Sequence, residues 1–372
     1  MKFPFNYRSF PLSFFISSQP SPDNNKKIEK ISPFGWKVLF ILSVIAVVVL
    51  YTETMISIAI PDIIKEFDIS YNTSSWILII YLIVAGIMTP ITGKLSDLYG
   101  RKKILILIVT SYTFGVIIGG FSTDIYLLLI ARIFQGIGIS FIPVAYSIIK
   151  DIFPVKKMAI AQSIFTSMFA FGSVLGILLG GSIIQYYGWN MTFYSLIPIT
   201  IAIAIVVGRL SHKIERDYKD TIEEEQNTVP IPKLVSRPHY EIRIEIDMIK
   251  RIANSIDIKG VLLLAVFLTS FFLLLTSFEN SSSNGNGNTS SDLNNLKQIV
   301  FLVIAIISIL LFIYVELKNN SSHLVDLRLF GNKSILIPNL LSLIVGFWIF
   351  VLFYTIPILS KNPPPAGLGI NS

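Results

Sequence analysis

Long apolar runs alternate with short polar segments along most of the chain, and this pattern predicts an all-α protein that crosses a membrane repeatedly. A hydrocarbon core of about 30 Å needs about 20 apolar residues per helix. Because the runs have about that length, we expect spanning helices at residues 36–58, 75–92, 103–122, 125–149, 158–184, 191–209, 259–278, 298–316 and 334–359. This odd number of crossings puts the two ends of the chain on opposite sides.

The polar segments between these runs divide the helices into groups. The start of the chain predicts a polar tail, because its short apolar patch, Phe10–Ile16, is interrupted by Pro11 and lacks the length of a signal-peptide core. The prediction is a tail, a six-helix group, a solvated connector, a pair of helices and a last helix, at residues 1–35, 36–209, 210–257, 258–316 and 317–372.

Basic residues gather in alternate loops and predict the orientation of the chain. The basic loops precede the first span and follow the second and fourth spans, at Lys26, Lys27, Lys30, Lys37, Lys94, Arg101, Lys102, Lys103, Lys150, Lys156 and Lys157. We therefore expect a plasma-membrane protein with its N-terminus in the cytoplasm and its C-terminus, as the chain stands, outside. Asn280 and Asn288 head Asn-x-Ser/Thr sequons in the outer segment 279–297, whose composition is that of a flexible linker. Glycosylation and chance occurrence both stay open there.

The composition supports the membrane prediction and excludes several other classes. Of the 372 residues, 53% are hydrophobic and 14% are charged, which is too little polar surface for a soluble fold of this size, so the lipid bilayer is the expected partner. The net charge of +7 lies in short loops and predicts no nucleic-acid partner. With no cysteine and three dissimilar histidines, no metal or cofactor is expected. No catalytic constellation of an intramembrane enzyme is present in the spans.

Three residues at the end of the second span recur at the end of the fifth. The two sets, 88 residues apart, are Gly93, Tyr99 and Gly100, and Gly181, Tyr187 and Gly188. Because the second and fifth spans would then be equivalent, the six helices of 36–209 are predicted to form two three-helix units of opposite orientation. Such a 3+3 inverted repeat occurs in one large class of transporters.

The segment GKLSDLYGRKK, which begins at Gly93, joins the second and third spans. It resembles the loop signature of the major facilitator superfamily. The resemblance implies a gate, in which the charges of Asp97 and Arg101 bridge helix ends in one conformation and part in the other. Gly93 allows close helix approach, Gly100 permits a tight reversal, and Lys102 completes the motif. The alternative is a tight turn with positive anchors.

The segment RIFQGIG in the fourth span resembles the fourth-helix motif of the same superfamily. A guanidinium inside a span costs at least a few kcal/mol, so Arg132 is expected to face a wet cavity or a carboxylate. Snorkelling to the outer interface is the alternative. The resemblance implies that Arg132 takes part in proton coupling, that Gln135 lines the same cavity and that Gly136 serves helix packing.

The first span ends in YTETMISIAIP, which resembles the first-helix motif of the fourteen-helix drug:proton antiporter branch. When the two are aligned on Pro61, the acidic residue of the family falls on Thr52, and Glu53 is displaced by one place. Thr52 and Glu53 are therefore candidates for a proton or cation site, with a solvated carboxylate as the alternative. Trp76 and Tyr81 also match this branch, although such aromatic residues are usually interfacial anchors.

Four glycines of the fifth span are predicted to serve close helix packing: Gly172, Gly176, Gly180 and Gly181. They resemble the antiporter signature of drug exporters, but the usual proline is Ile177 here. Packing alone and an export signature therefore both stay open.

The resemblance covers most of residues 36–369 and implies a six-helix N-terminal half followed by two extra central helices and the first helix of an incomplete second half. The incomplete second half has three possible explanations: a natural truncation, a split gene with a separately encoded partner, or a fragment of a longer reading frame. We expect a secondary transporter for small molecules, which exports amphiphilic or drug-like compounds in exchange for protons by alternating access. The alternative is a half-transporter or non-transporting subunit that needs a separately encoded C-terminal half.

Overall fold

A computed structural model describes residues 33–228, 257–283, 288–318, 324 and 327–361. All regular secondary structure in these residues is helical, and eight helical segments, with Ile125–Ile152 counted as one, are long and apolar enough to cross a membrane. The part of the last predicted span that is counted, Lys333–Trp348, is a shorter apolar helix. The predicted all-α membrane fold is therefore confirmed. Nearly all of the predicted N-terminal tail and the later part of the predicted connector lie outside the described residues.

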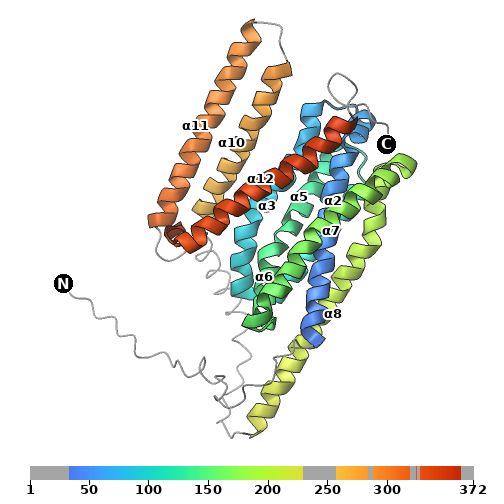
Figure 1. Ribbon diagram of the computed structural model, residues 1–372, viewed down its shortest axis with the longest axis vertical. Helices are drawn as coiled ribbons and strands as arrows, with labels where there is room; N and C mark the ends of the chain where they lie inside the picture. Colours follow the sequence, from blue (N-terminus) through green and yellow to red (C-terminus); the bar gives the residue numbers. More distant parts are fainter. Residues whose placement is uncertain (1–32, 229–256, 284–287, 319–323, 325–326, 362–372) are drawn as a thin grey trace, which may run out of the picture.

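The helices follow the predicted spans closely (Figure 1). In chain order they are α2 (Pro33–Phe67), α3 (Tyr71–Tyr99), α4 (Arg101–Gly120), α5 (Ile125–Ile139), α6 (Phe141–Ile152), α7 (Val155–Tyr187), α8 (Asn190–Thr228), α10 (Ile258–Ser283), α11 (Asn288–Lys318), the 3-10 helix η1 (Leu327–Gly331) and α12 (Lys333–Lys361). The last predicted span, 334–359, coincides with α12.

Three boundaries differ from the prediction. The fourth span is broken into α5 and α6 at Ser140, because Pro143 has no N–H to continue the helical hydrogen bonds. Helix α8 continues to Thr228 into the predicted connector, since residues 210–228 are rich in Lys, Arg and Glu, which favour helix. Helices α10 and α11 take up most of the predicted linker 279–297.

The first six spans pack as two interlocked three-helix units. Helix α2 packs against α7 and α3 against α5, while α4 contacts both α5 and α8. In the repeat, α2 corresponds to α5, and α3 corresponds to α7. The counterpart of the α2–α7 contact is therefore the α5–α3 contact, as an inverted repeat requires. Gly100 and Gly188, which match in the sequence, both end a helix at positive φ, at 94° and 84°. The backbone therefore carries the predicted repeat.

Glycines of α7 allow its close approach to α2. A Cβ built at Gly172 would lie 2.5 Å from the carbonyl oxygen of Val47, and one at Gly176 would lie 2.8 Å from that of Tyr51. One at Gly180 would lie 2.8 Å from a side-chain carbon of α2. These three positions recur every four residues and so share one helix face, where a larger residue would force the helices apart.

Gly136 allows a similarly close approach in the symmetry-related α5–α3 contact, although it lies on α5, the counterpart of α2. A Cβ there would lie 2.8 Å from the carbonyl oxygen of Tyr81. Gly181, however, faces open space, because a Cβ there would meet no atom within 4 Å. The packing prediction for Gly181 is therefore wrong in the described structure. The residue lies about 100° around the helix from Gly180, away from α2.

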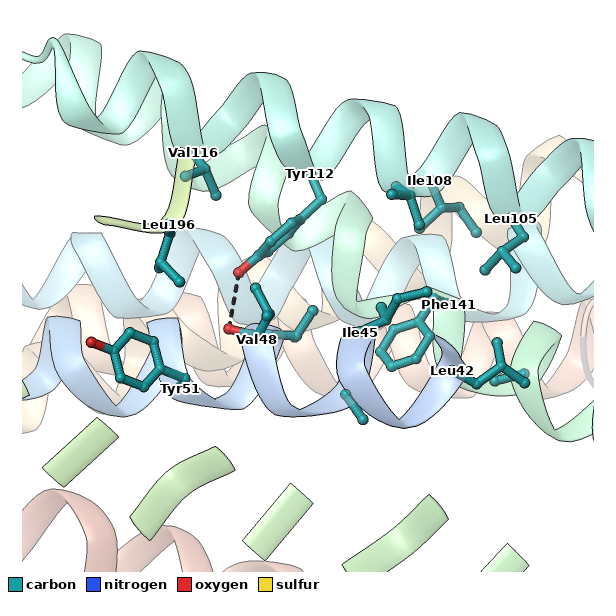
Figure 2. Close-up of a cluster of buried hydrophobic side chains, with 14 of the residues drawn as sticks. Leu42, Ile45, Val48, Tyr51, Leu105, Ile108, Tyr112, Val116, Phe141 and Leu196 are labelled. Carbon is teal, nitrogen blue, oxygen red and sulfur yellow. Dashed lines mark hydrogen bonds between the residues drawn. The ribbon is translucent and has the colours of Figure 1, made fainter. Parts of the chain in front are cut away.

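The core of the bundle lies between α2 and α4. Figure 2 shows apolar side chains from these two helices facing one another, joined by Phe141 of α6 and Leu196 of α8. The hydroxyl of Tyr112 points across this interface toward α2 and donates to the Val48 carbonyl at 3.4 Å. This buried polar contact lies beside the candidate site described below.

The remaining helices form a layer outside this bundle. Helices α10 and α11 pack against one another as a hairpin, and α10 contacts α3 (Figure 1). Helix α12 contacts α2 and η1. Many apolar side chains of these three helices are exposed, as expected for helices that face lipid.

Candidate functional site

The centre of the candidate site is an ion pair buried between α2 and α5. Arg132 Nη2 donates to Glu53 Oε2 at 2.7 Å. Arg132 is 0% exposed and Glu53 is 9% exposed. Arg132 therefore has a carboxylate partner and does not snorkel, and Glu53 is not a solvated end of its helix.

The rest of the guanidinium is held by α3 and by α5 itself. Its Nε donates to the Ile77 carbonyl at 2.9 Å, and its Nη1 donates to Gln135 Oε1 at 2.8 Å. The guanidinium carbon lies 4.2 Å from the centre of the Tyr81 ring, a cation–π contact. Tyr81 is 1% exposed, so it packs on Arg132 and is not an interfacial anchor.

Gln135 extends the same network to α4. Its Nε2 donates to the Gly115 carbonyl at 3.1 Å, while its Oε1 accepts from Arg132. The side chain is 0% exposed. These contacts hold the planar guanidinium in one orientation. It therefore presents a fixed positive charge to the Glu53 carboxylate.

Thr52 points toward α4 and away from the ion pair. Its hydroxyl donates to the Val48 carbonyl at 2.8 Å and accepts from the Tyr112 hydroxyl at 2.7 Å. Neighbouring residues of a helix point about 100° apart. Therefore Glu53, and not the residue aligned with the family's acidic position, meets Arg132 in this chain.

The predicted gating motif lies at the α3–α4 junction. Arg101 forms an ion pair with Asp151 at the end of α6, and its Nη1 donates to the Ser147 carbonyl at 2.8 Å. Asp97 lies 3.9 Å from Arg101 and is mostly exposed. The stronger partner of Arg101 is therefore Asp151, which the sequence analysis missed.

An open cavity of about 800 Å³ lies at this junction. Gly100, at φ 94°, makes the reversal between the two helices, and a Cβ there would meet no neighbouring atom. Lys102 lies on the wall of the cavity and is exposed, whereas Gly93 lies within α3 near Pro143. The motif thus places an ion pair between α4 and α6 at the mouth of an open space.

Comparison with known proteins assigns the fold. The sequence profile described as Major Facilitator Superfamily matches residues 34–364. The chain belongs to the major facilitator superfamily. Curated proteins that this chain resembles carry the name transporter.

Three curated relatives of this family member are similar over much of the chain. Multidrug resistance protein 3 of Bacillus subtilis (strain 168) is 31% identical over 60% of this chain and 43% of its own length. The riboflavin transporter RibZ of Clostridioides difficile (strain 630) is 26% identical over 84% of this chain and 58% of its own. Vacuolar basic amino acid transporter 2 of Saccharomyces cerevisiae is 26% identical over 80% and 58%. The chain spans about half the length of these relatives.

Among solved structures, the proton:xylose symporter XylE aligns with a TM-score of 0.42 at 14% identity, over 77% of this chain and 70% of that chain. A bacterial homologue of the human lysosomal transporter Spinster aligns with a TM-score of 0.44 at 22% identity, over 47% of this chain and 43% of that chain.

Proposed function

We propose that this chain works in a secondary transporter that exports amphiphilic or drug-like compounds in exchange for protons by alternating access. The observation that carries the proposal is the buried Glu53–Arg132 ion pair, which joins α2 to α5 at 2.7 Å. The name of the Bacillus subtilis relative, multidrug resistance protein 3, supports export of such compounds.

In this proposal Glu53 binds the coupling proton. Protonation removes the negative charge of the carboxylate and so ends its ion pair with Arg132, which keeps its contacts with Gln135 and the Ile77 carbonyl. Loss of the proton restores the pair. Because the pair joins two helices of different three-helix units, the two protonation states favour different packing of α2 against α5.

The Arg101–Asp151 pair at the α3–α4 junction is proposed as the gate. It joins the start of α4 to the end of α6 beside the open cavity. Opening requires this pair to part while the α3–α4 reversal at Gly100 stays intact. In this proposal the charges of Asp97 and Lys102 set the electrostatic environment of Arg101.

We further propose the arrangement of the whole chain in the plasma membrane. The α3–α4 junction and the N-terminus lie on the cytoplasmic side, since basic residues cluster there. Helices α2 to α8 form the N-terminal half of the transporter, α10 and α11 a central pair, and α12 the first helix of a C-terminal half. The alternative of a subunit that needs a separately encoded half is not favoured by the comparisons and stays a prediction.

The test is export of a fluorescent amphiphilic dye by membrane vesicles that contain the full chain. Efflux is expected to stop with a protonophore and in Glu53→Gln, whose side chain has the same shape but no charge. The matched control is Asp68→Asn, which removes an exposed carboxylate just after the end of α2 at φ 49°, where Asn is tolerated. Efflux by Glu53→Gln at the wild-type rate would refute the role of Glu53.

A further inference from the structure

Two carboxylates outside the Glu53–Arg132 pair are buried where α10 begins and α11 ends. Asp257 is 7% exposed and Glu316 is 2% exposed. A Cβ built at Gly260 would lie 3.2 Å from an oxygen of each carboxylate, so the two flank the same backbone position. Ionised carboxylates that are this close and this well shielded from water repel one another, and a cation beside them offsets this repulsion.

Backbone hydrogen bonds orient these carboxylates but supply no full charge. Asp257 Oδ1 accepts from the Gly260 N–H at 3.0 Å, which caps the start of α10. Glu316 accepts from the Leu324 N–H with both oxygens, at 2.9 and 3.2 Å. A basic side chain of a neighbouring helix can bring a full positive charge to these carboxylates.

Lys94 of α3 is a half-buried cation, and its charge interacts with those of both carboxylates. It lies eight residues after Gly86 of α3, and the two carboxylates flank Gly260, which lies eight residues before Leu268 of α10. The same two helices also touch through apolar groups, since a Cβ at Gly86 of α3 would lie 2.9 Å from Leu268 Cδ1 of α10. The interface between α3 and α10 therefore has an apolar part and a charged part.

We propose that Lys94, Asp257 and Glu316 form an electrostatic tether that fixes the α10–α11 pair to α3. Lys94 follows Gly93 directly and stands three residues before Asp97, so the tether is attached to the helix end that carries the gating motif. The helix pair and this end of α3 are thereby held as one unit. The tether does not depend on the proposed transport function, because its test measures structure and not transport.

The test measures the distance between the bundle and the helix pair. The chain has no cysteine, so spin labels can be attached at introduced cysteines alone. Phe114 on α4 and Leu310 on α11 are suitable positions, since they are 51% and 60% exposed. Pulsed electron paramagnetic resonance of the labelled full chain in lipid nanodiscs then gives the distance distribution. The variants are Lys94→Glu, Lys94→Glu with Glu316→Lys, and the exposed control Lys103→Glu.

We expect a narrow distribution in the wild type and one about twofold broader in Lys94→Glu, where a third carboxylate joins the cluster. The charge-swapped double variant and Lys103→Glu are expected to keep the wild-type distribution. A Lys94→Glu protein that folds only when Glu316→Lys is added also supports the tether. An unchanged distribution in Lys94→Glu overturns it. Failure of both Lys94 variants to fold, while Lys103→Glu folds, overturns it as well.

Discussion

The substitution Arg132→Met tests how much the buried ion pair stabilises the bundle. It leaves the Glu53 carboxylate buried without its partner, and breaking a buried pair in this way costs about 3–5 kcal/mol. Met fills most of the same apolar volume, so little packing is lost. The Ile77 carbonyl and the Gln135 amide oxygen, which accept from Arg132 at 2.9 and 2.8 Å, also lose their donor. We expect the free energy of unfolding to fall by about 4 kcal/mol.

A double variant separates the ion pair from the other contacts. Glu53→Gln combined with Arg132→Met removes both charges, so its loss is expected to be smaller than the sum of the single losses by about 2–3 kcal/mol. Thermal unfolding in mild detergent, followed by size-exclusion chromatography, measures this. At about 2–4 °C per kcal/mol, Arg132→Met is expected to lower the melting temperature by about 8–16 °C. A fall within about 2 °C, or additive single effects, would refute the reasoning.

Three further predictions concern packing, the gate and the hydroxyl network. Gly176→Leu is expected to reduce the yield of folded monomer strongly, while Gly181→Leu leaves it near wild type, since the latter position faces open space; equal yields would contradict the α7 packing. Arg101→Gln is expected to slow dye efflux at least about tenfold, whereas the exposed control Lys156→Gln keeps it; equal rates would contradict the gate. Tyr112→Phe, which removes a hydroxyl proton shared between Thr52 at 2.7 Å and the Val48 carbonyl at 3.4 Å, is expected to cost about 1 kcal/mol in thermal unfolding, and a loss of several kcal/mol would mean that its hydroxyl does more than bond across the core.

The sequence predicted the helices well because a chain in lipid must satisfy its backbone hydrogen bonds within each span. The break at Ser140 could have been predicted from Pro143, which removes one of those bonds. The extension of α8 was missed because residues 210–228 were interpreted as a solvated connector, although their Lys, Arg and Glu residues favour helix.

The candidate site was predicted in its members but not in its contacts. Arg132 was expected to face a wet cavity or a carboxylate, and Thr52 and Glu53 were both candidates for the proton or cation site. The rotation of α2 against α5 decides which of the two meets the guanidinium, and this rotation is a property of helix packing that no local pattern contains. Asp151 was missed for a related reason, because its pairing with Arg101 joins residues far apart in the sequence.

Tyr112 was missed although the sequence held a signal for it. A hydroxyl within an otherwise apolar span needs a hydrogen-bond partner, and Thr52 supplies one at 2.7 Å. The choice of partner depends on the α2–α4 contact in the core and so required the structure.

Proton movement driven by substrate tests the central claim, coupling through Glu53, most directly. The full chain would be reconstituted into vesicles that contain a pH-sensitive dye, and a gradient of an amphiphilic substrate would be imposed. We predict that the substrate gradient moves protons in the opposite direction in the wild type and moves none in Glu53→Gln. Proton movement by Glu53→Gln at the wild-type rate would contradict the account.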